Sequence, residues 1–404
     1  MLIPYIIGIL SALALVAIFA NRLDKTPVTL PMICLSVGVV LWWISGTGLD
    51  SVGNQSDQIL RIIAEATLAI VLFADAANLR IARLRHAYSW PLRMLAVGLP
   101  LAIVIGSIVN YALLPQIGIW GVVLLSALLA PTDAALGASV FSNTEVPERV
   151  RDSVLAESGM NDGLALPFII FAACGAVAGQ HEFAGDGWLI FAAKQVGLGI
   201  LIGFLGGSLG GYIINRAISL NLAEPKHGAM FVFLLIGIIF FLAEEFHGNS
   251  FVAVFIAGLF FGNFAKDHAH SAQEFLEAEG LLLTMASFVF IGAFVVPRGI
   301  EGISWQIVSI VLLSMFFVRP LAIWLSLLGS GAPAKTKLFL GWFGPRGLAT
   351  ALFAVFVLIQ FQAIEYGDTI IAVTALAVLI STFLHGISAY WAGPWLNTDD
   401  RDMQ

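Results

Sequence analysis

Two short stretches of an otherwise apolar sequence place carboxylates beside hydroxyls. In LLAPTDAALG, Thr132 and Asp133 follow a proline. In AESGMNDGLALP, Ser158 and Asp162 are four residues apart, so on a helix they share one face. Carboxylate and hydroxyl oxygens are the ligands that hard cations accept, and a carboxylate can hold a proton instead. These residues therefore indicate a site for a small cation or a proton.

The composition places these stretches in a membrane. The chain has 404 residues, of which 59% are hydrophobic and 11% charged, whereas soluble domains carry roughly 25% charged residues. Apolar runs of about 20 residues, the length that crosses a bilayer as a helix, recur from end to end. We predict an all-α polytopic membrane protein, with one transmembrane domain over 1–404 and a short cytoplasmic tail at 393–404. The thirteen predicted spans are 2–21, 27–46, 60–79, 93–114, 118–141, 150–176, 187–216, 228–246, 250–264, 280–297, 304–329, 337–360 and 368–392.

The basic residues of the loops predict the orientation. If the N-terminus lies outside, almost all loop Lys and Arg residues fall on the cytoplasmic side, and only Arg61 and Arg298 lie outside. This is the asymmetry that the positive-inside rule requires. We therefore predict an outside N-terminus and a cytoplasmic C-terminus.

The thirteen spans divide into a first repeat (1–176), a linker helix (187–216) and a second repeat (228–392). Six spans return the chain to its starting side and the seventh carries it across, so the two halves have inverted topology. The fifth span of each half contains a proline beside one charge, Asp133 in the first half and Arg346 in the second. Such paired broken spans mark the binding site of a transporter, because freed carbonyls and helix ends can line it.

Ionisable side chains deep in the spans indicate what this site binds. A charge at the bilayer centre costs at least about 2.5–3.5 kcal/mol, and structural ion pairing would explain the two arginines. Three carboxylates against two guanidiniums leave one negative charge, which a proton or a cation must match. Counted from the cytoplasmic end of each span, these five ionisable residues lie at depths of roughly 10–18 Å. We therefore expect their side chains to face one cavity. The five residues are Asp133, Glu157, Asp162, Arg319 and Arg346.

Other polar residues fit structural roles. Ser158 and Asn161 could serve as polar packing between helices, and His385 as a satisfied packing residue. A vestibule or structural role suits Glu65 and Asp75. Solvated or snorkelling positions near span ends are expected for Lys194, Glu244 and Glu245.

The motifs resemble those of a known family. PTDAALG, ESGMNDG, FVRP and GPRGL, in predicted spans 5, 6, 11 and 12, look like the motifs of NhaP-type bacterial Na⁺/H⁺ exchangers. These belong to the monovalent cation:proton antiporter family (CPA1). LAIVLFADAANLRIARLRH is similar to another family signature, and the likeness covers essentially the whole chain. The chain departs from the family at the first break, where Ala134 rather than proline follows Asp133.

The resemblance implies roles for individual residues. Asp162 would bind the cation and the proton in turn, with Ser158 and Thr132 as further cation ligands. Glu157 would also belong to this cation- and proton-binding group and support the site.

The remaining motif residues would act on the surroundings of the site. The resemblance implies that Asp133 compensates the broken helices, and that Arg319 and Arg346 pair with the acids and helix ends. Asn161, where other members carry a second Asp, resembles the electroneutral branch.

The function implied is exchange of Na⁺ or Li⁺ for H⁺, one for one, by alternating access in a homodimer of the bacterial inner membrane. The alternatives are a K⁺-selective or electrogenic antiporter and, in a different class, an organic-anion carrier on the same inverted-repeat fold. A channel would need a repeated filter segment, and an enzyme a nucleophile–base pair or HExxH; the sequence contains neither. We expect no cofactor beyond the transported ions, and no nucleic-acid partner.

Overall fold

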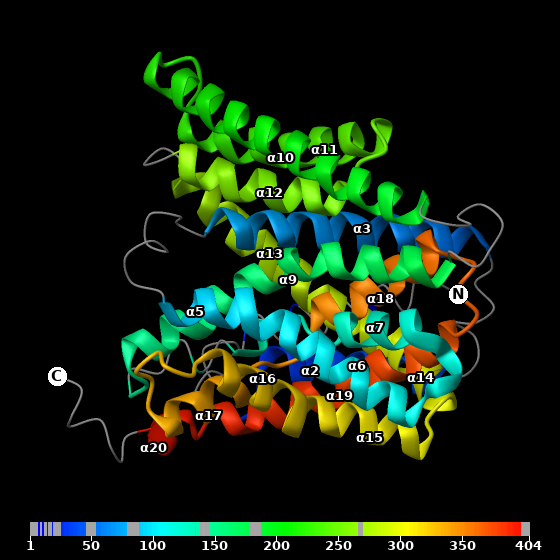
Figure 1. The fold of residues 1–404 in the computed structure, drawn as a ribbon. Helices are drawn as coiled ribbons and strands as arrows, with labels where there is room; N and C mark the ends of the chain where they lie inside the picture. Colours follow the sequence, from blue (N-terminus) through cyan, green and yellow to red (C-terminus); the bar gives the residue numbers. More distant parts are fainter. Residues whose placement is uncertain are drawn as a thin grey trace. The chain divides into compact units, whose positions relative to one another are not determined.

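The computed structural model describes residues 26–45, 54–78, 89–133, 135–137, 140, 145–177, 187–265 and 270–396, together with residues 7, 8, 10, 11, 14 and 18. Within these residues the regular structure is helical throughout (Figure 1), which confirms the all-α prediction. The first predicted span, 2–21, and the predicted tail, 393–404, lie largely outside the described residues.

Helices occupy every predicted span from the second onward. They are α2 (Leu30–Ser45), α3 (Asn54–Ala77), α5 (Ser89–Arg93), η2 (Met94–Gly98), α6 (Leu99–Leu113), α7 (Gly118–Leu128), α9 (Glu148–Val177), α10 (Gly187–Ser219), α11 (Pro225–Glu245), α12 (Ser250–Phe264), α13 (His270–Phe290), η6 (Ile291–Val295), α14 (Val296–Glu301), α15 (Trp305–Leu313), η7 (Ser314–Val318), α16 (Arg319–Ser326), α17 (Ala334–Trp342), α18 (Leu348–Gln360) and α19 (Gly367–Ala389). A short α20 (Ala392–Leu396) follows. The count of thirteen and the inverted repeat stay predictions.

Several of these helices are suited to a bilayer. By length and composition alone, seven of the described helices could cross a membrane. Shorter apolar helices add to them, among them Pro115–Leu128 and Leu348–Gln360. These two are short because the chain leaves the helical conformation at each predicted break.

The described residues form two compact units. The first comprises Met1–Leu60, Ser89–Asn161 and Met285–Gln404, and the second comprises Arg61–Tyr88 and Asp162–Thr284. The division falls inside α9, so the helix that carries the ESGMND motif contributes residues to both units.

In the first unit, α6 packs against α7 and α16, and α19 packs against α14, α15 and α18. Figure 1 shows α16 and α17 side by side. An apolar core joins α5, the first turns of α9, α16 and α17, with Trp90, Phe339 and Phe343 among its largest side chains. Because Phe343 is the first residue after α17, this core anchors one end of the second break.

Three helices of the first unit contain a five-residue π-helical turn, namely η2, η6 and η7. Each turn is followed, two residues later, by a proline: Pro100, Pro297 and Pro320. Proline has no N–H for the helix and its ring clashes with the carbonyl four residues earlier. A wider turn ahead of the proline relieves that clash, so the helix continues, and η7 delivers Arg319 directly after its last residue.

In the second unit, α10 packs closely on α12 because of a glycine stripe. A Cβ added at Gly199 would lie 2.8 Å from the Asn249 carbonyl oxygen. At Gly203 and Gly207 it would overlap the carbonyl oxygens of Ala253 and Ala257. Small residues at this spacing let helix backbones approach in a membrane protein. The contacts of α10 with α12 and α11 therefore form the frame of this unit (Figure 1).

Candidate functional site

Both predicted helix breaks are present in the first unit. Helix α7 ends at Leu128 and residues 131–133 are non-helical; α17 ends at Trp342 and residues 343–347 are non-helical before α18 begins. The two breaks meet directly, because the Asp133 N–H donates to the carbonyl oxygen of Pro345 at 2.8 Å.

The acid of the first break stabilises the helix that follows the second. The Asp133 Oδ2 accepts the backbone N–H of Leu348, the first residue of α18, at 2.6 Å. A Cβ at Gly347 would overlap this carboxylate, so the glycine makes room for it. An N-terminal helix end carries a partial positive charge. Asp133 therefore caps α18 across the break.

The arginine of the second break stabilises the helix that precedes the first. Arg346 donates from Nε to the carbonyl oxygen of Leu129 at 2.9 Å, and Leu129 is the C-cap residue of α7. It also donates to the carbonyl of Gly344 and to Ser314 Oγ, the latter at 3.2 Å. A C-terminal helix end carries a partial negative charge. Each break thus supplies the charge that compensates a helix end at the other.

The second arginine pairs with an acid. Arg319 donates from Nη1 and Nη2 to the two carboxylate oxygens of Glu157, at 3.1 and 2.9 Å, a bidentate geometry that suits guanidinium and carboxylate. Its side chain lies against Gly344, where an added Cβ would overlap Nε. We expected both arginines to pair with acids or helix ends, and the structure gives them different partners. Arg319 bonds Glu157, while the bonds described for the Arg346 guanidinium go to backbone carbonyls and Ser314.

Helix α9 holds the first break through Thr132. The Thr132 N–H donates to Asn161 Oδ1 at 3.1 Å, and the Thr132 carbonyl accepts Ser158 Oγ at 3.0 Å. Asn161 Nδ2 donates to Thr132 Oγ1 at 2.6 Å and to Glu157 Oε1 at 3.1 Å. The structure therefore brings together the predicted site residues Thr132, Glu157, Ser158 and Asn161.

Asp162 is the next residue of α9 and is 7% exposed. It lies one helical turn after Ser158 on the continuous helix, as the spacing predicts. By compactness it belongs to the second unit. There its neighbour Gly163 lies so close to the Phe255 ring of α12 that a Cβ would overlap the ring. Close packing of α9 on α12 thus fixes the position of α9 next to the Asp162 carboxylate.

The predicted buried charges are the ones that the structure buries. Among the described residues, the buried Asp, Glu, Lys and Arg side chains are Asp133, Glu157, Asp162, Arg319 and Arg346, each 2–7% exposed. By contrast, Lys194, Glu244 and Glu245 are exposed, as predicted for span ends, and Glu65 and Asp75 are half-buried.

Sequence reasoning missed several polar neighbours of the arginines. An enclosed cavity of about 20 Å³, roughly the room that one water needs, is lined by both arginines and by Asn110, Ser126 and Ser314. Asn110 Nδ2 donates to Ser126 Oγ at 2.9 Å, which joins α6 to α7. In the sequence, these residues could have been found as polar side chains in the middle of apolar spans.

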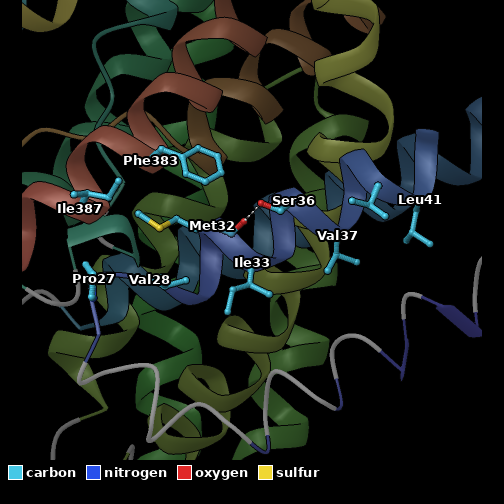
Figure 2. Close-up of a pocket in the computed structure, with 10 residues that line it drawn as sticks. Pro27, Val28, Met32, Ile33, Ser36, Val37, Leu41, Phe383 and Ile387 are labelled. Carbon is cyan, nitrogen blue, oxygen red and sulfur yellow. Dashed lines mark hydrogen bonds between the residues drawn. The ribbon is translucent and has the colours of Figure 1, made fainter. Parts of the chain in front are cut away.

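A second, wider pocket has a different chemistry. It measures about 550 Å³ and lies between α2 and α19, where Figure 2 shows Met32 and Ile33 on one side and Phe383 and Ile387 on the other. Its one hydroxyl, Ser36 Oγ, donates to the Met32 carbonyl at 2.7 Å (Figure 2). The lining is therefore apolar, and the ion-site residues lie elsewhere.

Broken helices that meet within an integral membrane protein and compensate one another's ends are typical of secondary transporters. The transmembrane region of the sodium/hydrogen exchanger family matches residues 9–393. The chain therefore belongs to the sodium/hydrogen exchanger family.

Individual relatives agree with this assignment. The K⁺/H⁺ antiporter NhaP2 of Shewanella sp. (strain MR-4) is 29% identical over 301 residues, which are 73% of this chain and 51% of the relative. The K⁺/H⁺ antiporter NhaP of Alkalimonas amylolytica is 26% identical over 360 residues, 87% of this chain and 59% of the relative. A Na⁺/H⁺ antiporter of Schizosaccharomyces pombe is 30% identical over 170 residues, covering 41% of this chain and 36% of the relative. The chain thus spans about half the length of the first two relatives.

A solved structure shares the fold. The sodium proton antiporter MjNhaP1 from Methanocaldococcus jannaschii, at pH 8, matches with a TM-score of 0.75 and 23% sequence identity, over 98% of both chains.

Proposed function

We propose that the protein exchanges a monovalent cation for a proton across the membrane, with Asp162 as the group that binds either one. Supporting roles for Asp133, Glu157, Arg319 and Arg346 agree with their contacts in the first unit, which are at helix ends or in an ion pair. The five buried charges sum to one negative charge, and a buried carboxylate must hold a proton or a cation. The family match favours this reading over an organic-anion carrier.

The observation that carries the proposal is the attachment of Thr132 to α9. Ser158 Oγ lies 3.0 Å from both the carbonyl and the hydroxyl oxygen of Thr132, one turn before Asp162. By helix spacing the Ser158 hydroxyl and the Asp162 carboxylate share one face of α9, and oxygens of these kinds suit a hard monovalent ion. The Glu157–Arg319 pair and Asn161 hold these oxygens in place without adding net charge.

We propose Na⁺, with Li⁺ as an analogue, as the exchanged cation. K⁺ is a second candidate, because the NhaP2 relative of Shewanella and the NhaP relative of Alkalimonas amylolytica are named as K⁺/H⁺ antiporters. Dissipation of a pH gradient in proteoliposomes, scanned with Na⁺, Li⁺ and K⁺ at equal concentration, distinguishes them. No response to any of the three ions would contradict cation/proton antiport.

Exchange is proposed to be one for one, by alternating access at a single site. The cation and the proton compete for Asp162, so each crossing carries one of them and moves the same net charge. Asn161 is part of this argument, because an Asp at that position would add a second acid that could carry a second proton.

We propose that the protein works as a homodimer in the bacterial inner membrane, with its N-terminus outside and its C-terminus in the cytoplasm. The resemblance to NhaP-type exchangers supports the dimer, and the distribution of basic loop residues supports the orientation. Each protomer would transport independently. Reconstitution into lipid nanodiscs tests the assembly: a monodisperse and stable monomer would contradict it.

A further inference from the structure

His385, in α19, is a fully buried histidine (1% exposed) whose two ring nitrogens both face polar atoms of the first unit. Nε2 lies 3.1 Å from the carbonyl oxygen of Trp342. Nδ1 lies 3.0 Å from Ser381 Oγ and 3.2 Å from the Ser381 carbonyl oxygen, so the hydroxyl is its nearer partner. Trp342 is the last residue of α17, so its carbonyl accepts no N–H from within the helix; it accepts the Gly344 N–H of the break at 2.8 Å. The histidine therefore stands at the entrance of the second break.

These contacts favour a proton on Nε2. A carbonyl oxygen can only accept, so Nε2 must bear the hydrogen that it donates to Trp342. In a neutral imidazole Nδ1 is then an acceptor, and the hydroxyl of Ser381 is placed to donate to it.

Ser381 in turn holds the backbone of the break. Its Oγ accepts the N–H of Arg346 at 2.6 Å. This leaves the hydroxyl hydrogen for His385 Nδ1. Hydrogen bonds therefore run in one direction, from Arg346 N–H to Ser381, and from Ser381 to His385, whose Nε2 donates to Trp342. The chain joins both sides of the non-helical segment to α19.

The other hydroxyls of α19 behave differently. Thr374 and Thr382 donate to carbonyls one turn back in their own helix, and Ser388 donates to the carbonyl of His385. The bonds described for Ser381 instead go to Arg346 and His385. Ser388 Oγ also accepts the indole N–H of Trp342 at 3.0 Å, and the Trp342 and His385 rings lie 5.0 Å apart at 30°. Ser381, His385 and Ser388 thus each have a described polar contact with Trp342 or with Arg346 of the break.

We propose that His385, as the neutral Nε2–H tautomer, is a positioning residue that acts through Ser381. Through Ser381 it fixes the backbone of the second break and so places the Arg346 side chain against the end of α7. The imidazole serves as a fixed donor and acceptor pair. Neither the cation nor the transported proton touches it.

The first test is spectroscopic and independent of transport. The protein is labelled with ¹⁵N-histidine, reconstituted in lipid and compared by solid-state NMR with a His385→Gln variant, which assigns the His385 signals. We expect one protonated and one bare ring nitrogen at pH 7.5, with the proton on Nε2. A proton on Nδ1, or on both nitrogens, would overturn the proposal.

The second test uses variants and rests on the proposed antiport. Ser381→Ala leaves the buried Arg346 N–H without its acceptor, which should lower cation-dependent exchange at least about fivefold. Thr382→Val is the matched control: it removes the adjacent buried hydroxyl, whose described bond stays within α19. It should exchange like the parent. Parent-like exchange by Ser381→Ala, or an equal loss in Thr382→Val, would overturn the proposal.

A double variant separates positioning from general loss of stability. If His385 acts through Ser381, the loss of melting temperature in Ser381→Ala combined with His385→Ala should be clearly smaller than the sum of the two single losses. Thr382→Val combined with His385→Ala should show additive shifts. Additive shifts in both pairs would contradict the chain of hydrogen bonds. If the parent exchanges no cation, the proposed function fails while the NMR result still decides the role of His385.

Discussion

At the scale of single residues, Asn161 shows why an amide stands beside the proposed ion-binding acid. It accepts the Thr132 N–H through Oδ1 and donates through Nδ2 to Glu157. A carboxylate cannot donate, and it would place a second negative charge against Glu157. The amide thus holds the first break to α9. Of the two residues in the ND motif, only Asp162 can then bind a proton.

Replacement of Asp162 by Asn should abolish exchange while folding and insertion stay intact, because the change keeps the shape and removes the titratable charge. Exchange is measured in proteoliposomes, and folding by size-exclusion profile and thermal melting in detergent. Glu245→Gln, which neutralises an exposed acid at the end of α11, is the control and should exchange normally. Substantial exchange by a well-folded Asp162→Asn protein would contradict the shared-site mechanism.

The two arginines should differ when each is replaced by Ala. Arg319→Ala strands the buried Glu157 carboxylate, and breaking such a pair costs about 3–5 kcal/mol. Arg346→Ala leaves the Leu129 carbonyl and Ser314 without a donor, a loss of about 1–3 kcal/mol. In detergent, the melting temperature should therefore be highest for the parent, lower for Arg346→Ala and lowest for Arg319→Ala.

A compensating change tests the reason for this ranking. Glu157→Gln added to Arg319→Ala removes the stranded charge and should recover part of the lost stability. No recovery would show that the ion pair is not the cause of the loss.

At the scale of the helices, glycines and prolines decide how closely and how straight the elements pack. The stripe of α10 places helix backbone on helix backbone at α12, with no side chain between them. In α6, α14 and α16 the prolines coexist with helical structure because a π-helical turn precedes each of them.

Gly207→Ala should destabilise the protein, because the new Cβ would overlap the Ala257 carbonyl. Overpacking of this kind typically costs about 1–3 kcal/mol. Gly197→Ala is the matched control in the same helix, since a Cβ there meets nothing within 4 Å, and it should be neutral or stabilising, by up to about 1 kcal/mol. Melting temperatures in detergent compare the two variants. Equal melting temperatures would contradict close packing of α10 on α12.

At the scale of the whole molecule, the buried charge count governs the response to voltage and pH. The site has one net negative charge, which one Na⁺ or one H⁺ neutralises. The loaded site therefore carries the same charge in both directions of transport. The exchange rate should therefore be the same with and without a potential set by K⁺ and valinomycin. A clear dependence on voltage would contradict one-for-one exchange.

Competition at one carboxylate also predicts how cation affinity depends on pH. Because the cation ligand must be deprotonated, apparent Na⁺ affinity should rise about tenfold per pH unit below the pKa of the site and level off above it. Exchange rate measured against Na⁺ concentration at several pH values gives this curve. An affinity that does not change with pH would show that the two ions do not share a site.

The sequence by itself determined the helical spans from the second onward, both breaks and the five buried charges. Each follows from local chemistry: apolar runs of membrane length, prolines within them, and ionisable residues too costly to bury without a role. The face shared by Ser158 and Asp162 follows from helix spacing alone. The sequence also predicted that α11 and α12 are separate helices, which the break after Glu245 confirms.

Only the tertiary structure decided which charge serves which partner. Arg319 bonds Glu157, 162 positions away in the chain, while Asp133 and Arg346 each reach a helix end belonging to the other break. Partners so distant depend on how helices pack, and packing depends on close fits, such as Arg319 against Gly344, that no local pattern encodes. For the same reason, the proposed role of Ser381 and His385 could not be predicted from the sequence. A buried hydroxyl can bond its own helix or a neighbouring one, and only the position of the neighbour decides which.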